Sequence, residues 1–340
     1  MPSNTAAWLT AEKAHPFEVK AAPLGTPGEN QILIKNHAVA INPIDGKLQT
    51  LAFYPIPYPT ILGQDVAGEV VSVGPNVISF QKGDRVIGNT TGFSTKQDTE
   101  KAFQAYTILE TTLTCKVPES ISFEKGVVLP LSVSTAASGL FNPDFLNLRV
   151  PTTPAQNSTG ETLLVWGGAS SVGSSAIQLA VAAGYEVITT ASAKNFEYVK
   201  KLGASQVFDY KTPTIVSYLV EALKGKKVVG AFDAVGGAAW VFTTEVIHKT
   251  EGATKFVATV TPRFPEPPEG VTMKQMFALS IRGNHVAEAV WGKFLPKALE
   301  AGTFVPAPEP FVAGHGLEKI QEAVDIQRKG TSAQKVVVTL

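Results

Sequence analysis

The first 130 residues combine short apolar runs with frequent glycine and proline. Gln31–Ala40 has the composition of a strand, and residues 63–77, with recurring valines and glycines, predict a strongly bent antiparallel strand. Residues 82–88 continue this pattern, whereas the proline-rich segment 42–59 is interpreted as a turn region. The pattern indicates a mainly β, barrel-like domain with few long helices.

Beyond residue 130 the apolar positions change their spacing. Residues 131–141 predict a buried helix, and residues 162–168 form the short continuous apolar run typical of a buried parallel strand. A helical pattern follows and ends at Gly184. Further strands are then predicted at 186–192, 205–210, 228–237, 254–260 and 277–286, and helices at 195–203, 215–223 and 240–247. This alternation predicts right-handed βαβ units and an α/β fold with a doubly wound parallel sheet.

The C-terminal part contains two more predicted helices, at 287–301 and 317–330, and a last strand at 335–340 that should return to the first domain. A chain of 340 residues exceeds the size at which one hydrophobic core keeps growing, so two domains are expected. We expect residues 1–130 to form the substrate and catalytic domain and residues 131–290 the nucleotide-binding domain. Residues 291–340 are expected to pack on the catalytic domain.

Composition excludes several classes of function. The formal net charge is zero, which gives no general field to attract nucleic acid or an anionic membrane. No apolar run approaches the roughly 20 residues needed to cross a bilayer, and the first 14 residues do not resemble a secretory signal. The single cysteine, Cys115, cannot form an internal disulfide. A cytoplasmic protein without nucleic-acid or membrane partners is expected.

A small-residue turn lies between the buried strand at 162–168 and the helix after it. Diphosphate binding needs close approach of the backbone and free amides at a helix N-terminus, and small residues permit both. The residues concerned are Gly168, Ala169, Ser170, Ser171, Val172 and Gly173. A glycine-rich turn can also be purely steric, but the βαβ units that follow favour dinucleotide binding.

The phosphate preference is encoded about twenty residues further on. An NAD site expects Asp or Glu at the end of the second strand, where the carboxylate accepts from the ribose. This chain instead has Ser192, Lys194 and Asn195, with Tyr210 after the third strand. A cation and hydroxyl or amide donors suit a 2′-phosphate, so NADPH is the expected cofactor. The alternative is that Lys194 is a solvated surface residue and Asn195 caps the next helix.

The sequence resembles a known family over essentially its whole length. The segments GGASSVGSSAIQLA, FDAVGG and GLEKIQEAVDIQRKGTSAQKVVV are similar to the medium-chain dehydrogenase/reductase superfamily, whose members join a GroES-like domain to a Rossmann domain. INPIDGK, ILGQDVAGEV and ASAKNFEYVKKLGA resemble its zinc-free fungal branch, which includes trans-acting enoyl reductases and quinone oxidoreductase-like relatives. The resemblance implies further cofactor contacts at Thr135, Val235, Val260 and His285. Thr135 could equally be an ordinary helix residue, and a lone histidine such as His285 is more often structural.

The same resemblance predicts that zinc is absent. Zinc-dependent members hold the catalytic metal with a cysteine near the position of Asn42 and a histidine in a Gly-His-Glu motif, which here reads Gly63, Gln64, Asp65. Their structural zinc lobe carries four cysteines, and the corresponding residues 88–104 have none. Tetrahedral zinc needs several thiolate or imidazole ligands, so no metal is expected.

Without a metal, reduction of an activated alkene is the chemistry expected of this scaffold. Hydride attack at the β-carbon places charge on a carbonyl oxygen, which hydrogen-bond donors can stabilise. Candidate donors are Asn42, Asp45, Lys47 and Tyr54; the alternative is that Asp45 pairs with Lys47 in a turn and that Tyr54 packs in the proline-rich loop. The aromatic and proline-rich residues 53–58 are candidates to line the substrate site.

Several readings of function stay open at this point. The leading one is an NADPH-dependent, zinc-independent reductase of enones, quinones or 2-enoyl thioesters, with a free substrate and one bound to a carrier protein as open alternatives. A metal-free carbonyl reductase and a non-catalytic NADPH-binding sensor or accessory protein are the alternatives. The chain is expected to be a monomer or a homodimer, with the predicted strand 277–286 as a sheet edge available for pairing.

Overall fold

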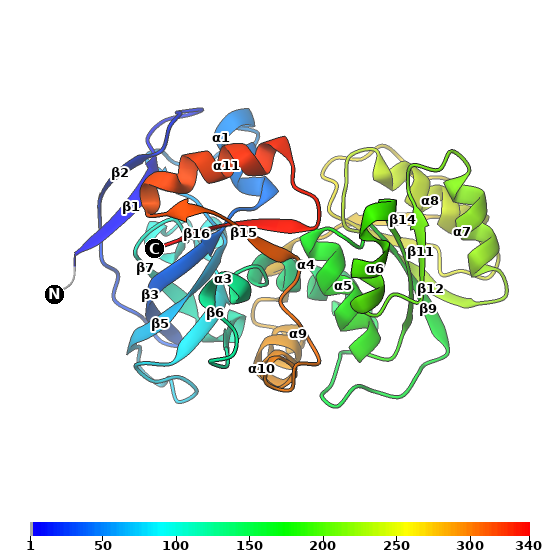
Figure 1. Cartoon of the computed structure of the whole chain (residues 1–340), viewed down its shortest axis with the longest axis horizontal. Helices are drawn as coiled ribbons and strands as arrows, with labels where there is room; N and C mark the ends of the chain where they lie inside the picture. The colour runs from blue at the N-terminus through cyan, green and yellow to red at the C-terminus, as the bar shows by residue number, and fades with distance from the viewer. Residues whose placement is uncertain (1–2) are drawn as a thin grey trace. The chain divides into compact units, whose positions relative to one another are not determined.

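The computed structural model describes residues 3–340, which divide into two compact units. Unit 1 joins the residues up to Leu131 with Leu299–Leu340, and unit 2 is Ser132–Ala298. In Figure 1, the blue N-terminal and red C-terminal elements accordingly belong to the same unit. The chain therefore builds unit 2 as an uninterrupted insertion into unit 1.

Unit 1 is built mainly of antiparallel strands. Its larger sheet has the order β15-β16-β3-β5-β6-β8, with β7 paired to β3, and a smaller sheet has the order β2-β1-β4. The strands are β1 (Asn4–Leu9), β2 (Glu18–Ala22), β3 (Gln31–Ala40), β4 (Thr60–Ile61), β5 (Asp65–Val73), β6 (Arg85–Asn89), β7 (Tyr106–Glu110), β8 (Thr114–Lys116), β15 (Glu309–His315) and β16 (Gln334–Thr339). The predicted β-rich first domain is confirmed.

The pairing of β3 with β5 is irregular, as expected for a bent strand. The register shifts between Leu33 and Ile34 and again between Asn36 and Ala38. At Gly68 an added Cβ would lie 2.0 Å from the carbonyl oxygen of Lys35, so the two strands cross too closely for any other residue. The C-terminal strand β16 pairs antiparallel with β3, which confirms its predicted return to the first domain.

The prediction of a turn over residues 42–59 is wrong for its first half. Residues Pro43–Leu51 form helix α1, because three start signals coincide: Asn42 at the N-cap, proline at the first position and Asp45 in the first turn. The helix ends at Ala52, which adopts a left-handed conformation with φ 45°. Figure 1 shows α1 beside α11 (Ile320–Lys329), the predicted C-terminal helix. Shorter helices of this unit are α2 (Gly92–Thr95) and α3 (Phe123–Gly126).

Unit 2 contains a parallel sheet with the order β11-β10-β9-β12-β13-β14. The strands are β9 (Glu161–Trp166), β10 (Glu186–Ala191), β11 (Gln206–Asp209), β12 (Lys227–Asp233), β13 (Phe256–Thr259) and β14 (Thr272–Gln275). Read in chain order, this is the 3-2-1-4-5-6 arrangement of dinucleotide-binding sheets, which reverses direction beside its first strand. The predicted doubly wound α/β sheet is confirmed.

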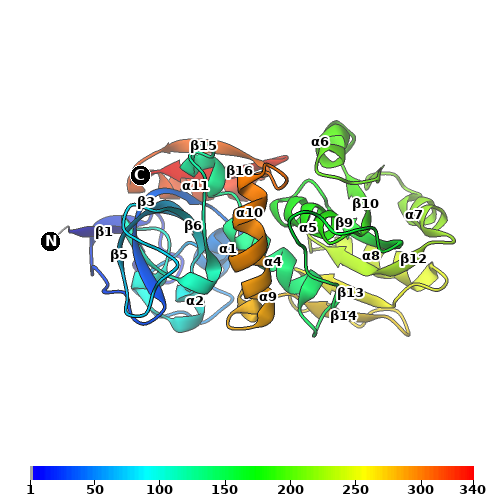
Figure 2. The ribbon, with the colours of Figure 1, turned by 90° about the horizontal axis from the view of Figure 1, so that it is seen from below.

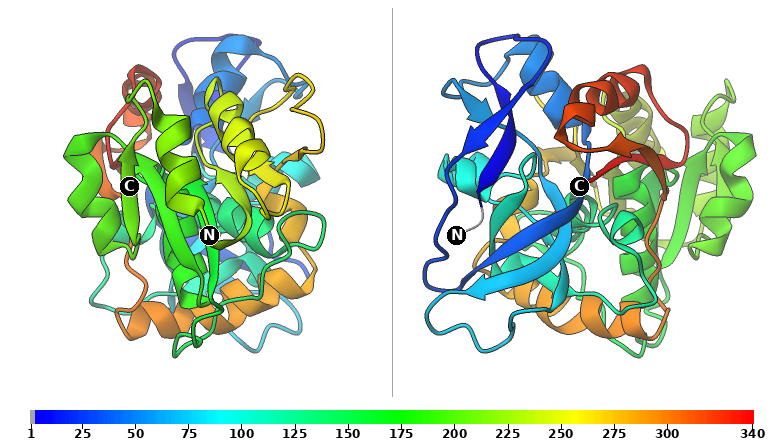
Figure 3. Two further views of the ribbon diagram at one scale, coloured as in Figure 1. Left: turned by 90° about the vertical axis from the view of Figure 1, so that its right-hand side faces the viewer. Right: turned by 60° about the vertical axis from the view of Figure 1, so that its left-hand side comes forward.

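Helices cover both faces of this sheet. They are α4 (Pro130–Phe141), α5 (Ser171–Ala182), α6 (Phe196–Lys201), α7 (Ile215–Leu223) and α8 (Ala239–Lys249). Figure 3 (left) shows α6 on one side of the strands and α7 and α8 on the other. Leu219 and Leu223 of α7 pack with Val246 and Ile247 of α8 and with sheet residues such as Leu164 in one buried cluster. The apolar spacing of each helix thus buries one stripe against the strands.

The predicted strand 277–286 is absent, and β14 occupies the sheet edge instead. Ala278–Ile281 form a 3-10 turn, and a new helix begins at His285. Two local features cause this: Gly283 has φ 73°, and the Asn284 side chain accepts a hydrogen bond from the amide of Val286 as a helix cap. Ala278, Leu279 and Ile281 are buried in this turn, and a short apolar run does not distinguish such a turn from a strand.

From His285 the chain forms one continuous helical rod, as Figure 2 shows. It consists of α9 (His285–Ala287), a π-helical segment (Glu288–Phe294) and α10 (Leu295–Glu300), which confirms the helix predicted at 287–301. Trp291 is fully buried, and its Nε1 donates to the Ser134 hydroxyl of α4 at 3.2 Å. No helix among residues 3–340 has both the length and the apolarity to cross a membrane.

Candidate active site

The small-residue turn of unit 2 is held tightly between β9 and α5. Gly167 adopts φ 83°, and its amide donates to the Thr190 hydroxyl at 3.0 Å. Gly173 lies in the first turn of α5, where an added Cβ would be 2.2 Å from the Gly167 carbonyl oxygen. The helix thus approaches the strand more closely than any other residue would permit, as the glycine spacing predicts.

This turn also presents unused hydrogen-bond donors. Ser170 is the N-cap of α5, and its hydroxyl accepts from the Gly173 amide at 3.0 Å. Within residues 3–340, the amides of Ser171 and Val172 have no acceptor. Free amides and the positive end of the helix dipole together suit an anion, so these residues fit a dinucleotide diphosphate.

The other predicted cofactor residues of the sheet follow the carboxyl ends of neighbouring strands. Ser192 comes directly after β10 and Tyr210 after β11, and the last residues of these strands, Ala191 and Asp209, are paired in register. Val235 follows β12, and its Cγ2 is 2.1 Å from the place where a Cβ on Gly167 would stand. The structure therefore brings these predicted residues to one edge of the sheet.

Asp233 organises this edge, and sequence analysis did not single it out. The side chain is fully buried; Oδ1 accepts from the amides of Val235 (3.0 Å) and Gly236 (3.1 Å). Oδ2 accepts from the Thr259 hydroxyl at 2.7 Å, and the backbone carbonyl accepts from the amide of Val260 at 3.1 Å. One carboxylate thus fixes the turn after β12 and the end of β13. The available signal was an aspartate ending a buried strand directly before Ala-Val-Gly-Gly.

The residues predicted to meet a 2′-phosphate are accessible. Lys194 is exposed and has no ion pair with any residue from 3 to 340, and Tyr210 is 44% exposed. Asn195 donates from Nδ2 to the Ser192 hydroxyl at 3.1 Å. The nearest strand-end carboxylate, Asp209, accepts the amide of Lys211 at 2.9 Å. A cation and three neutral polar side chains therefore lie at the ends of β10 and β11.

Two further predicted cofactor residues lie apart from the sheet edge. Thr135 is nearly buried on α4, and His285 is exposed at the first position of α9 rather than at a strand end. The segment before His285 is tied to α4, since the Ser280 hydroxyl bonds to that of Ser138 at 2.8 Å. Their contacts with a cofactor stay predictions.

In unit 1, the predicted donor Asn42 belongs to a buried charged cluster. Its Nδ2 donates to Asp65 Oδ2 at 2.8 Å, and its Oδ1 accepts from Lys335 Nζ at 2.5 Å. Lys335 also pairs with Asp65 at 3.0 Å, with 4% and 0% of the two side chains exposed. Asp65 Oδ1 accepts the Leu131 amide at 2.5 Å. Both ends of the Asn42 amide are thus engaged within the protein, and a role toward substrate stays a prediction.

Asp45 lies one turn along α1 and is fully buried. Its Oδ2 accepts the Asn42 amide at 2.8 Å, which completes the helix start. Burial raises the pKa of this carboxyl from 3.8 to about 7, against the lowering effect of the Asn42 amide, and the nearby Asp65 adds to the increase. Lys335 lowers the pKa of Asp45, but not enough to cancel the cost of burial.

This raised pKa predicts a pH-dependent stability for Asp45→Asn. Between pH 3.8 and about 7 the folded protein keeps a proton that the unfolded chain releases, so this group's contribution to stability falls as pH rises through that window. At pH 5, which lies about one unit inside this window, the variant should be more stable than the wild type by only on the order of 1–2 kcal/mol. At pH 8, where only the wild type buries a charge, the variant should be more stable by on the order of 2–4 kcal/mol.

Thermal unfolding midpoints of both proteins at pH 5 and pH 8 measure this difference. Glu119→Gln, an exposed acid of the same unit, is the matched control and should shift neither midpoint. An equal stability difference at both pH values would contradict the assignment.

Lys47 and Tyr54, the predicted proton donors, lie in different surroundings. Lys47 is exposed on α1, and within the described part of the chain its ammonium has no partner. Tyr54 lines a hollow of unit 1 together with residues 55–57, 61, 62, 64, 92, 93, 96 and 101. The Tyr54 and Phe93 rings stand 5.0 Å apart, tilted by 39°. Residues 54–57 line this hollow and Lys47 does not, and the role of residues 53–58 at the substrate site stays a prediction.

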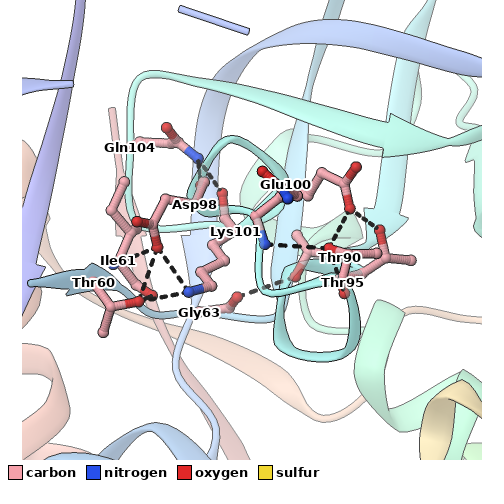
Figure 4. Close-up of polar contacts among 11 residues, drawn as sticks. Thr60, Ile61, Gly63, Thr90, Thr95, Asp98, Glu100, Lys101 and Gln104 are labelled. Atoms are coloured by element: carbon pink, nitrogen blue, oxygen red, sulfur yellow. Dashed lines mark hydrogen bonds and ion pairs between the residues drawn. The ribbon is translucent and has the colours of Figure 1, made fainter. Parts of the chain in front are cut away.

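A polar network holds the far wall of this hollow, and Figure 4 shows its members. Lys101 Nζ donates to the Thr60 hydroxyl (2.5 Å) and to Asp98 (2.7 Å), and Asp98 also accepts the Ile61 amide at 3.1 Å. Glu100 accepts the hydroxyl of Thr95 at 2.7 Å. Hydrogen bonds thus tie the loop after β6 to β4, in the segment that carries the zinc cysteines in zinc-dependent relatives.

The search for metal ligands within residues 3–340 finds no group of three or more His, Cys, Asp or Glu side chains that could hold an ion. Cys115, the free thiol, is buried in β8. In the cluster of Asp45, Asp65 and Lys335, the ammonium group of Lys335 is the cation that pairs with Asp65.

Comparison with known proteins gives consistent matches. The model of the alcohol dehydrogenase GroES-like domain matches residues 28–119, and that of the zinc-binding dehydrogenase family matches residues 171–300. The chain is 57% identical over 338 residues to the zinc-binding alcohol dehydrogenase domain-containing protein cipB of Emericella nidulans, covering 99% of this chain and 98% of that one. It is 39% identical to the trans-enoyl reductase himH of Aspergillus japonicus, covering 99% and 97%.

A solved structure agrees with the fold. An alcohol dehydrogenase superfamily protein from Novosphingobium aromaticivorans superposes with a TM-score of 0.77 at 26% identity, covering 99% of both chains. The GroES-like unit, the dinucleotide-binding sheet and these relatives lead to one assignment. The chain belongs to the medium-chain dehydrogenase/reductase superfamily of NAD(P)-binding oxidoreductases, in the branch that contains fungal dehydrogenases and trans-enoyl reductases.

Proposed function

We propose that this oxidoreductase uses NADPH to reduce a carbon–carbon double bond conjugated to a carbonyl group, without a metal ion. The carrying observation is the sheet edge of unit 2, where free helix amides and the unpaired cation Lys194 lie at the ends of adjacent strands. The first group suits a diphosphate and the second a 2′-phosphate. The similarity to a trans-enoyl reductase supports an alkene as the reducible group.

The proposed division of roles follows from the side chains present. When bound, NADPH supplies the hydride. Ser171 and Val172 hold the diphosphate through their amides, and Ser192, Lys194 and Tyr210 discriminate the 2′-phosphate from a hydroxyl. In unit 1, Tyr54 and Lys47 are the candidates that deliver a proton to the α-carbon, because both have a free polar end and lie in or after α1. Neutral donors replace a Lewis acid at the carbonyl oxygen.

The test is cofactor oxidation at the nicotinamide absorbance band with a panel of conjugated enones, quinones and 2-enoyl thioesters, followed by product identification. We expect saturated carbonyl products and a preference for NADPH over NADH. An allylic alcohol as the product would establish a carbonyl reductase. Tight NADPH binding without turnover of any substrate would contradict catalysis of this reaction.

Lys194→Gln tests the cofactor assignment within the same assay. Losing a charge-assisted contact to phosphate should raise the KM for NADPH roughly tenfold and leave that for NADH unchanged. Lys201→Gln, another exposed lysine at the end of α6, is the matched control and should change neither value. Equal effects of the two substitutions would show that Lys194 is only a surface residue.

A further inference from the structure

We infer that Gln64 is a catalytic residue, which donates a hydrogen bond from its side-chain amide to the carbonyl oxygen of the substrate in the hollow lined by Tyr54 and Phe93. This inference rests on the proposed reduction of a conjugated carbonyl compound. It names the group that stabilises the developing negative charge, a role for which sequence analysis considered Asn42, Asp45, Lys47 and Tyr54.

The hollow is lined mainly by apolar side chains. Apart from Gln64, its walls consist of the Tyr54 and Phe93 rings, of Ile56 and other aliphatic or proline side chains, and of two lysines. One lysine, Lys101, is committed to Thr60 and Asp98 beneath the wall. A mostly apolar pocket with a few placed polar groups is the usual form of a small-molecule site.

Gln64 is the nearly buried residue of this lining whose side chain has no hydrogen-bond partner within residues 3–340. The residue is only 7% exposed. Its backbone carbonyl accepts from the Thr90 amide at 2.9 Å and from Asn89 Nδ2 at 3.2 Å, but its side-chain amide has no hydrogen-bond partner in the described chain. Its side-chain nitrogen and oxygen are not among the fully buried unpaired atoms of residues 3–340, so the amide remains accessible to a ligand in the hollow. A ligand with a carbonyl oxygen would satisfy it.

The backbone at this position is rigid, as a preorganised donor requires. Gly63 precedes Gln64 with φ 96°, and an added Cβ there would lie 2.5 Å from the Phe103 ring. Asp65 follows, anchored by Asn42, Lys335 and the Leu131 amide. The buried charged cluster therefore holds the residue next to Gln64 in place. Donors fixed in this way stabilise developing charge without reorganising during the reaction.

A side-chain amide can stabilise the negative charge that develops in this reaction. The substrate accepts a hydride at its β-carbon, the C=C π bond breaks, and its electron pair becomes an enolate with most charge on oxygen. A proton then adds at the α-carbon from Tyr54, Lys47 or solvent, giving the saturated carbonyl compound and NADP⁺. The hydrogen bond from the Gln64 amide to the carbonyl oxygen strengthens as negative charge grows on that oxygen. It therefore stabilises the transition state more than the ground state. The predicted substrate class is a conjugated ketone, quinone or thioester with an apolar substituent.

The experiment compares Gln64→Leu with wild type on trans-4-phenyl-3-buten-2-one, with Gln97→Leu, an exposed glutamine of the neighbouring loop, as control. We expect kcat for Gln64→Leu to fall about 100- to 1,000-fold, the usual loss on removing one such donor. NADPH affinity should stay unchanged, and Gln97→Leu should behave as wild type. Activity of Gln64→Leu within twofold of wild type would overturn the inference.

Gln64→Glu supplies a readout that a structural role would not give. A carboxylic acid can donate this hydrogen bond only when protonated, so the variant's kcat should rise as pH falls through the pKa of its new carboxyl group. The wild type should show no such step. A pH profile parallel to that of wild type would argue against Gln64 as a donor.

Binding separates failure of this inference from failure of the proposed function. Should wild type turn over no substrate, ligand-observed NMR with trans-4-phenyl-3-buten-2-one in the presence of NADP⁺ still tests the site. A five- to tenfold weaker Kd for Gln64→Leu, the worth of one net hydrogen bond, would then support the site without the reaction. Equal Kd values would overturn the site itself.

Discussion

Replacing Gly173 by alanine should weaken NADPH binding roughly five- to hundredfold and lower the thermal unfolding midpoint as well. The added Cβ would lie 2.2 Å from the Gly167 carbonyl oxygen and 2.9 Å from Gly168 Cα, and both obstacles are backbone atoms that no rotamer change removes. The first turn of α5 would have to move away from β9, at a cost of about 1–3 kcal/mol for overpacking. The amides of Ser171 and Val172 would move with it.

Fluorescence titration of NADPH gives the affinity, and Gly292→Ala is the matched control. Gly292 is also a helical glycine of unit 2, but its nearest neighbour to an added Cβ is Glu288 Cγ at 4.0 Å. Alanine there should leave both affinity and stability unchanged or slightly increase stability. An unchanged Kd for Gly173→Ala would mean that the diphosphate is held elsewhere.

Lys335→Met should destabilise the protein by about 3–5 kcal/mol, the usual cost of removing one partner of a buried ion pair. The substitution keeps the aliphatic volume but removes the ammonium that contacts Asp65 at 3.0 Å and Asn42 at 2.5 Å. Asp65, whose side chain is fully buried, would then lose its cationic partner. The neighbouring carboxyl groups of Asp45 and Asp65 would then be buried without the ammonium group of Lys335.

Chemical unfolding of unit 1 measures this loss, and a second substitution tests its cause. Asp65→Asn in the Lys335→Met background should restore part of the lost stability, because an amide leaves no buried charge. The exposed pair of Lys319 with Glu322 provides the control. Lys319→Met should cost less than about 1 kcal/mol, as surface ion pairs do. Similar losses at both lysines would show that packing, and not charge, makes Lys335 important.

Local patterns were sufficient to predict unit 2. Each βαβ unit contains its own start, stop and apolar spacing, so the strands from β9 to β13 and the turn at Gly173 follow from short windows of sequence. The segment 277–286 was misassigned because Ala278, Leu279 and Ile281 look alike in a strand and in a buried turn. The decisive features, φ 73° at Gly283 and the cap at Asn284, act over only a few residues.

The site in unit 1 was less accessible to sequence analysis for a different reason. The hydrogen bond between Asn42 and Lys335 joins residues 293 positions apart, and no periodic pattern connects them. Asn42, Pro43 and Asp45 are typical of a helix N-terminus, but the segment 42–59 was predicted as a turn region because of its later prolines. Gln64 was noticed only as the residue in place of a zinc ligand. Its unpaired side chain becomes apparent only once every neighbour is placed.

The late position of β16 also determines the order in which the protein can be completed during synthesis. Unit 2 is continuous from Ser132 to Ala298, so it has all its residues before unit 1 does. Unit 1 must wait for Lys335 before Asp65 gains its cation and β3 gains β16 as a neighbour. Until then the half that is translated first exposes an open sheet edge and an unpaired acid. During synthesis, the first segment of unit 1 therefore waits for its missing strand until after unit 2 has all its residues.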